Sequence, residues 1–231
     1  MLDAFATTEF WIALGQIIIV NIMLSGDNAV VIALACRSLP PKQQRSAIIF
    51  GSIGAIVLRV ILTFFAVMLL KLPFLKLAGG AALLWIGAGL LSSDDEEGDL
   101  EAHSNLGAAI RTIIIADFIM SLDNVLGVAA AAKGSTLLLI LGLAISIPLI
   151  IYGSQIILKL MGRFPIIITL GAALLGWVAG EMLVDDSSVS GWVGANASFL
   201  HLLVPVVCTV GVVVVGKWMD ARNKRSEPAA A

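Results

Sequence analysis

The chain has 231 residues, of which 59% are hydrophobic and only 13% are charged. With a mean hydropathy of +1.03, this composition excludes an ordinary soluble domain and indicates a polytopic membrane protein. The formal net charge of −2 says little about partners, because the positions of the charges matter more in a membrane protein, and we expect no nucleic-acid partner. The two cysteines have no paired spacing, so we expect neither a disulfide nor a thiolate metal site.

Seven apolar runs are long enough to cross a hydrocarbon core of about 30 Å. In chain order they lie near residues 10–35, 46–70, 73–92, 106–132, 135–161, 164–184 and 200–219. The predicted fold class is therefore an all-α membrane protein with seven transmembrane helices. No nucleotide-binding or catalytic motif stands out, and we expect no enzyme activity.

The distribution of the basic residues predicts the orientation, because Lys and Arg in short loops stay in the cytoplasm. We predict that the N-terminus is outside and the C-terminus is in the cytoplasm. Of the fourteen Lys and Arg residues, three then face outward, Arg59 lies inside a helix and the other ten are cytoplasmic. The cytoplasmic ten are Arg37, Lys42, Arg45, Arg111, Lys159, Arg163, Lys217, Arg222, Lys224 and Arg225. The opening stretch has no basic residue before its first apolar run, so we expect a retained helix rather than a cleaved signal peptide.

A polar pattern occurs twice inside these apolar runs, at an offset of 96 residues. The two copies are Asn21, Ser25, Asp27 and Asn28, and then Asp117, Ser121, Asp123 and Asn124. An Asp at the centre of a membrane helix costs roughly 2.5–3.5 kcal/mol on insertion scales, so such residues are functional by default. The pattern therefore predicts a site built between two halves of the chain.

The duplication extends to a Gly-Ala-Ala-Leu-Leu segment that begins at Gly80 and again at Gly171. Three helices per unit is an odd number of crossings, so the second unit must enter the membrane from the opposite side. We predict an inverted repeat of three plus three helices with an extra C-terminal helix. Its predicted segments are a first repeat at 8–92, an acidic cytoplasmic loop at 93–105, a second repeat at 106–186, a seventh helix at 198–220 and a cytoplasmic tail at 221–231.

Residues spaced i, i+4 and i+7 share one face of a helix, so Asn21, Ser25 and Asn28 line one stripe and Asp117, Ser121 and Asn124 line another. Carboxylate, amide and hydroxyl oxygens suit hard cations such as Mg²⁺, Ca²⁺ and Mn²⁺. Met23 and Met120 lie nearby and are more typical of core packing, although a thioether would favour Mn²⁺. The choice of divalent ion stays open at this point.

Two further charged residues lie within the predicted helices. Arg59 occupies the middle of the second run, and we expect it to pair with one of the carboxylates when the cation is absent. Glu181, late in the sixth run, is either a second-repeat pathway residue or an interfacial charge beside Asp185 and Asp186.

Straight helices would place Asp27 and Asp123 on opposite sides of the midplane, more than about 10 Å apart along the membrane normal. That separation is too large for one ion ligated at about 2.1–2.6 Å. Either both helices break at these positions, or there are two sites that share Asp117. We expect broken helices, because unwound carbonyls complete cation sites in many transporters.

The segments Leu-Ser-Gly-Asp-Asn-Ala-Val at 24–30 and Ser-Leu-Asp-Asn-Val-Leu at 121–126, set among seven apolar helices, resemble the TerC family of bacterial integral membrane proteins. The compact length and the acidic loop are most similar to its YjbE-type branch. The resemblance implies a manganese exporter of the bacterial plasma (inner) membrane, related to the exporters of the LysE superfamily. The family's acidic and Asn positions fall on Asp27, Asn28, Asp117, Asp123 and Asn124, with Asn21, Ser25, Ser121 and Glu181 as further candidates.

We therefore expect a secondary, proton-coupled transporter that embeds in the lipid bilayer, moves Mn²⁺ as its substrate and binds no cofactor tightly. One alternative is export of another small solute, an amino acid or an oxyanion such as tellurite, although several intramembrane Asp residues against one Arg disfavour an anion. The other alternative is a non-transporting membrane factor that assists metalation or secretion of exported proteins and contacts the secretion machinery. The oligomeric state is open.

Overall fold

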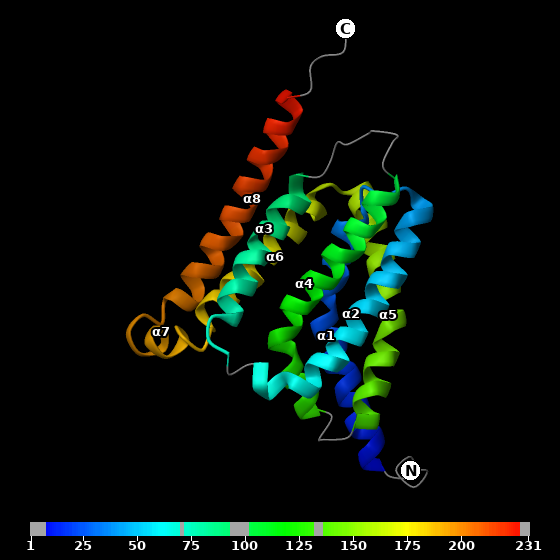
Figure 1. Cartoon of the computed structure of the whole chain (residues 1–231), viewed down its shortest axis with the longest axis vertical. Coiled ribbons are helices and arrows are strands. Elements are labelled where there is room, and N and C mark those ends of the chain that lie inside the picture. Colours follow the sequence, from blue (N-terminus) through cyan, green and yellow to red (C-terminus); the bar gives the residue numbers. More distant parts are fainter. Residues whose placement is uncertain (1–7, 70–71, 93–101, 132–135, 227–231) are drawn as a thin grey trace.

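The computed structural model describes residues 8–69, 72–92, 102–131 and 136–226. This part of the chain forms eight α-helices (Figure 1). They are α1 (Thr8–Cys36), α2 (Pro41–Leu69), α3 (Leu75–Ser92), α4 (Ala102–Ala131), α5 (Thr136–Arg163), α6 (Ile166–Val184), α7 (Ser190–Asn196) and α8 (Leu200–Ser226). The short α7 was not predicted. The helix α4 begins inside the last residues of the predicted acidic loop, and α8 extends beyond the predicted end of the seventh run.

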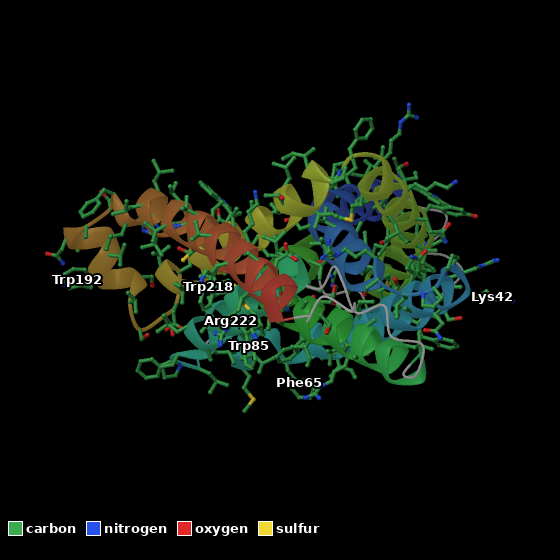
Figure 2. All side chains as sticks on the ribbon, turned by 90° about the horizontal axis from the view of Figure 1, so that it is seen from above. Lys42, Phe65, Trp85, Trp192, Trp218 and Arg222 are labelled. Atoms are coloured by element: carbon green, nitrogen blue, oxygen red, sulfur yellow. The ribbon has the colours of Figure 1, made fainter. Side chains whose placement is uncertain are left out.

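Five helices are long and apolar enough over the described residues to cross a membrane. Their spans are Pro41–Phe65, Leu75–Ser92, Ile140–Arg163, Ile166–Val184 and Leu200–Asn223. The all-helical membrane class is thereby confirmed. Large apolar side chains are exposed on the surface, including Trp85 at 77%, and Figure 2 shows Phe65 and Trp192 at the periphery of the molecule. Such a surface is typical of a protein whose solvent is lipid.

The long helices form two groups that lie side by side (Figure 1). The four-helix group contains α1, α2, α4 and α5, with α1 packed on α5 and α2 packed on α4. The three-helix group contains α3, α6 and α8. Figure 1 shows α1, α3, α5 and α8 running upward and α2, α4 and α6 running downward. The end where α5 and α8 finish carries basic residues and is called the basic end below: Arg37, Lys42, Arg45, Arg111, Lys159, Arg163, Lys217 and Arg222.

Glycines allow the helices of the three-helix group to approach closely. A Cβ on Gly176 of α6 would lie 2.8 Å from the Cys208 carbonyl oxygen of α8. Gly180 likewise lies directly against the backbone of Pro205. Helix association in membranes depends on this kind of small-residue contact, and here it holds α6 against α8.

The predicted breaks in the two motif helices are wrong. Both α1 and α4 are continuous α-helix through Asp27 and through Asp123. A continuous helix satisfies its own backbone N–H and C=O groups, whereas a break in the membrane must supply other partners for each freed group. Gly26 gives the backbone more conformational freedom than other residues would, but α1 stays helical through it. The alternative of two sites that share Asp117 remains the prediction.

Asp186, in the loop after α6, caps the first turn of α3. Its carboxylate accepts hydrogen bonds from the backbone N–H groups of Phe74 at 3.1 Å, Lys76 at 3.0 Å and Leu77 at 3.2 Å, and Ser188 donates two more. Phe74 has a φ of 66°, a left-handed conformation that is unfavourable for a bulky residue. Asp186 thus stabilises the strained turn that leads into α3 and ties it to the end of α6.

This cap predicts an acid-dependent loss of stability. Burial raises the pKa of Asp186, but the hydrogen bonds from Ser188, Leu77 and Phe74 outweigh burial and lower the pKa from 3.8 to about 2. Because the pKa of Asp186 is lower in the folded protein, its ionised carboxylate contributes its full stabilisation above the unfolded-state pKa. That contribution is lost as the pH falls through about 2. Between pH 5 and pH 2, we expect the free energy of unfolding of the wild type to fall by about 2 kcal/mol more than that of Asp186→Asn. Thermal unfolding in detergent measures this difference. The exposed Asp185→Asn variant serves as the control, and a wild-type advantage independent of pH would contradict the assignment.

Candidate functional site

The centre of the candidate site is a buried ion pair between α2 and α4. Arg59 Nη2 lies 2.6 Å from Asp117 Oδ1. Arg59 Nε donates a hydrogen bond to Ser121 Oγ at 3.0 Å, and that hydroxyl donates to Asp117 Oδ2 at 3.1 Å. The three side chains therefore form a closed ring of charge-assisted hydrogen bonds, with every member fixed by the other two.

The sequence of α2 explains how Arg59 reaches α4. A Cβ on Gly51 would lie 2.8 Å from Ile113 Cδ1, and one on Gly54 would lie 2.9 Å from Ile114 Cδ1. These glycines bring the two parallel helices into close contact on the basic-end side of the ion pair. Arg59 follows Gly51 by eight residues, on about the same face of α2, and there it contacts Asp117.

The ion pair is almost completely removed from solvent. Arg59 is 1% exposed and Asp117 is 6% exposed. Taking two charges out of water costs several kcal/mol each, and only their mutual attraction and further hydrogen bonds offset that penalty. Removing either partner therefore leaves an uncompensated charge inside the helix bundle.

Other buried polar side chains gather in the same four-helix group. Among the described residues, the buried polar set outside that group consists of Asp186 alone. Inside the group are Asn28 of α1, at 2% exposed, Ser52 of α2 and Ser154 of α5, together with the ion-pair ring. Asp27, next to Asn28, is half-buried. The predicted site residues with described side chains on α1 and α4 thus lie in one group of helices.

Ser52 and Ser154 were missed by the sequence analysis, although a signal was present. Ser52 ends the segment Ile-Ile-Phe-Gly-Ser at 48–52, and Ser154 ends the closely similar Ile-Ile-Tyr-Gly-Ser at 150–154. Both serines are buried, and Ser154 Oγ donates to the Ile150 carbonyl oxygen of its own helix at 2.7 Å. The two similar segments lie on α2 and α5, at an offset of 102 residues.

The remaining predicted site residues are not brought to the ion pair by any described contact. Glu181 is exposed on α6 and accepts a hydrogen bond from Trp177 Nε1 at 2.8 Å. The side chains of Asn21, Ser25, Asp123 and Asn124 lie outside those that the structure describes. Among the described residues, no group of three or more His, Cys, Asp and Glu side chains is placed so that it could hold a metal ion.

Taken together, the fold and the buried ion pair define an integral, all-helical membrane protein with a charged centre between α2 and α4. The chain belongs to the TerC family of integral membrane proteins, whose family model matches residues 6–224. The resemblance found in the sequence is thereby confirmed.

Several relatives are similar along most of their length. The chain is 41% identical over 216 residues to the membrane protein YjbE of Bacillus subtilis, which covers 94% of this chain and 99% of YjbE. It is 26% identical over 182 residues to the membrane protein YceF of the same organism, covering 74% and 70% of the two chains. The inner membrane protein YgdQ of Escherichia coli strain K12 is 24% identical over 197 residues, covering 78% and 83%. No solved structure matches the chain significantly.

Proposed function

We propose that this protein exports a divalent cation, with Mn²⁺ as its substrate, across the bacterial plasma membrane by a proton-coupled secondary mechanism. The observation that carries the proposal is the buried pair of Arg59 and Asp117. The Arg59 guanidinium is a positive charge of the protein itself, and it binds the intramembrane carboxylate of Asp117 where a transported cation would bind. When the metal arrives, Asp117 exchanges the guanidinium for the ion.

Charge balance supports a divalent substrate. Asp27, Asp117 and Asp123 carry three negative charges in the motif helices, and Arg59 carries one positive charge, so the ionised set has a net charge of −2. One divalent cation, or two protons, neutralises that set. Because moving bare charge through a bilayer is expensive, exchange of one divalent ion for two protons lets both forms of the carrier reorient as neutral species.

The ligand chemistry supports a hard cation. Asp27, Asn28 and Asp117 offer carboxylate and amide oxygens, the ligands that Mg²⁺, Ca²⁺ and Mn²⁺ prefer. Met120 precedes Ser121 in the sequence but is buried in an apolar cluster on α4, so no observed contact of its thioether distinguishes Mn²⁺ from the other two ions. The family resemblance points to Mn²⁺. We propose Asp27, Asn28, Asp117, Asp123 and Asn124 as the metal-binding residues, divided between two sites that share Asp117.

We propose an inverted repeat in which α1, α2 and α3 are equivalent to α4, α5 and α6. Two observations support this arrangement: α1 packs on α5 as α4 packs on α2, and the first unit starts at the end opposite to the second (Figure 1). The basic end is proposed to be cytoplasmic, since basic residues of short loops stay there. The seven-span topology then has the N-terminus outside.

The test is metal uptake by inverted membrane vesicles or proteoliposomes that contain the full chain. We expect uptake of Mn²⁺ driven by an imposed proton gradient, inhibited by a protonophore and competed by other divalent ions less well than by Mn²⁺ itself. Vesicles with Asp27→Asn protein at the same density, a variant expected to lose export and to keep its stability, serve as the control. Absence of uptake of any divalent ion by correctly inserted protein would contradict the proposal and favour a non-transporting membrane factor.

A further inference from the structure

A groove of about 690 Å³ lies between the start of α2 and the second half of α5 at the basic end. Its volume is within the range of about 300–1,000 Å³ that small-molecule sites occupy. Arg45 of α2 and Lys159 of α5 line it together with Gln155, and the apolar part of its wall includes Ile48 and Ile151. The groove is thus polar and cationic in one part and apolar in another.

The two parts lie at different depths. Lys159 is one turn from the end of α5 and Arg45 is one turn from the start of α2, so both cations lie near the ends of candidate membrane spans. The lining of α5 runs back to Ile147, twelve residues before Lys159, or about 18 Å along the helix. That distance is comparable to one leaflet of a hydrocarbon core about 30 Å thick. The groove therefore runs from the level of the lipid headgroups into the level of the acyl chains.

The chemistry of the groove identifies the class of its occupant. Two cations from different helices at the mouth repel a divalent metal ion, so the groove is a poor entrance for the proposed substrate. A free anion would make no use of the apolar wall, and a soluble partner does not reach acyl-chain depth. Basic pockets between membrane helices bind anionic lipid headgroups, and an anionic phospholipid matches both parts at once.

We propose that this groove binds one anionic phospholipid, with its phosphate between Arg45 and Lys159 and an acyl chain along Ile151. The lipid fills the space between α2 and α5 on the surface of the bundle, where Tyr152 is exposed beside it. Because α2 also carries Arg59, the lipid supports the position of the helix that supplies the ion pair. The neighbouring Lys42, which Figure 2 shows at the edge of the molecule, does not line the groove.

The experiment measures lipid retention on the purified full chain by native mass spectrometry and by thermal unfolding in detergent. Phosphatidylglycerol, phosphatidylcholine and inorganic phosphate are added separately. The groove variant is Arg45→Gln with Lys159→Gln. The control variant, Arg111→Gln with Lys217→Gln, makes the same charge change at exposed sites of the same end, outside the groove.

We expect wild type and the control variant to bind phosphatidylglycerol in preference to phosphatidylcholine. The groove variant should lose about thirtyfold in affinity, equivalent to about 2 kcal/mol, which is the contribution of two cations near an anionic surface. Ile151→Trp, which fills the apolar part, should also reduce binding while both cations remain. Equal losses in the groove and control variants, no preference for the anionic lipid, or equal protection by inorganic phosphate would each overturn the proposal.

Discussion

Replacing Asp117 with Asn should abolish metal export and lower the free energy of unfolding by about 3–5 kcal/mol. The reason is that Arg59, which is 1% exposed, would keep its charge and lose the carboxylate that compensates it. Arg59→Met should have a similar effect on stability, because the Asp117 carboxylate would then be buried without its partner. Thermal or denaturant unfolding of the purified protein measures the stability, and vesicle uptake measures the export.

The double variant Arg59→Met with Asp117→Leu separates a structural role from a transport role. Replacing both members of a buried ion pair by apolar residues is often neutral or stabilising, and Ser121 can then bond to a carbonyl of its own helix. We expect the double variant to recover most of the lost stability and to remain inactive. Recovered export in the double variant would contradict the proposal, since the pair would then serve only to hold α2 against α4.

A surface pair provides the matched control for these substitutions. His201 Nδ1 lies 3.5 Å from Asp185 Oδ1, with both side chains about half exposed. Such pairs contribute about 0–1 kcal/mol. Asp185→Asn should therefore change neither the stability measurably nor the export rate, although it removes a carboxylate from the same chain.

The apolar runs were sufficient to predict the seven long helices, although not the short α7, and the charges inside these runs indicated both residues of the ion pair. The spacing of Asp117 and Ser121 places them on one stripe of α4, and the structure joins them by a hydrogen bond. The same rule places Asn28 on the stripe and Asp27 beside it, which agrees with their burial. Periodicity could not predict which carboxylate pairs with Arg59, because the pairing depends on how α2 packs against α4.

Two other features were missed, one because it depends on a tertiary contact and one because it depends on backbone hydrogen bonding. Asp186 follows a membrane helix and resembles an interfacial charge in the sequence, yet it caps α3 more than a hundred residues earlier in the chain. The continuity of α1 and α4 follows from backbone hydrogen bonding, whereas the repeated polar pattern suggested unwinding. The local sequence determines which side chains are polar, whereas the packing of the helices determines which of them come into contact.

Replacing Asp27 with Asn should reduce export at least about thirtyfold while leaving the empty protein as stable as wild type. In contrast to Asp117, the Asp27 carboxylate is half-buried and has no hydrogen bond or ion pair to the described side chains. Removing its charge therefore breaks no such contact, and it relieves the penalty of holding a charge inside the bundle. Loss of a charged ligand should instead weaken the metal complex by about 2 kcal/mol or more, as expected when one partner of a buried charge contact is removed.

The measurement that separates these effects is thermal stability with and without Mn²⁺. A ligand that binds only the folded state stabilises it by about 2.7 kcal/mol at a hundred times its dissociation constant. We expect this Mn²⁺-dependent stabilisation in wild type and in Asp220→Asn, a matched substitution on α8, and its loss in Asp27→Asn. If Asp27→Asn kept both the Mn²⁺-dependent stabilisation and the wild-type export rate, Asp27 would not be a ligand. The site would then have to be built from α4 and its neighbours alone, and the repeated carboxylate in α1 would have no part in binding the ion.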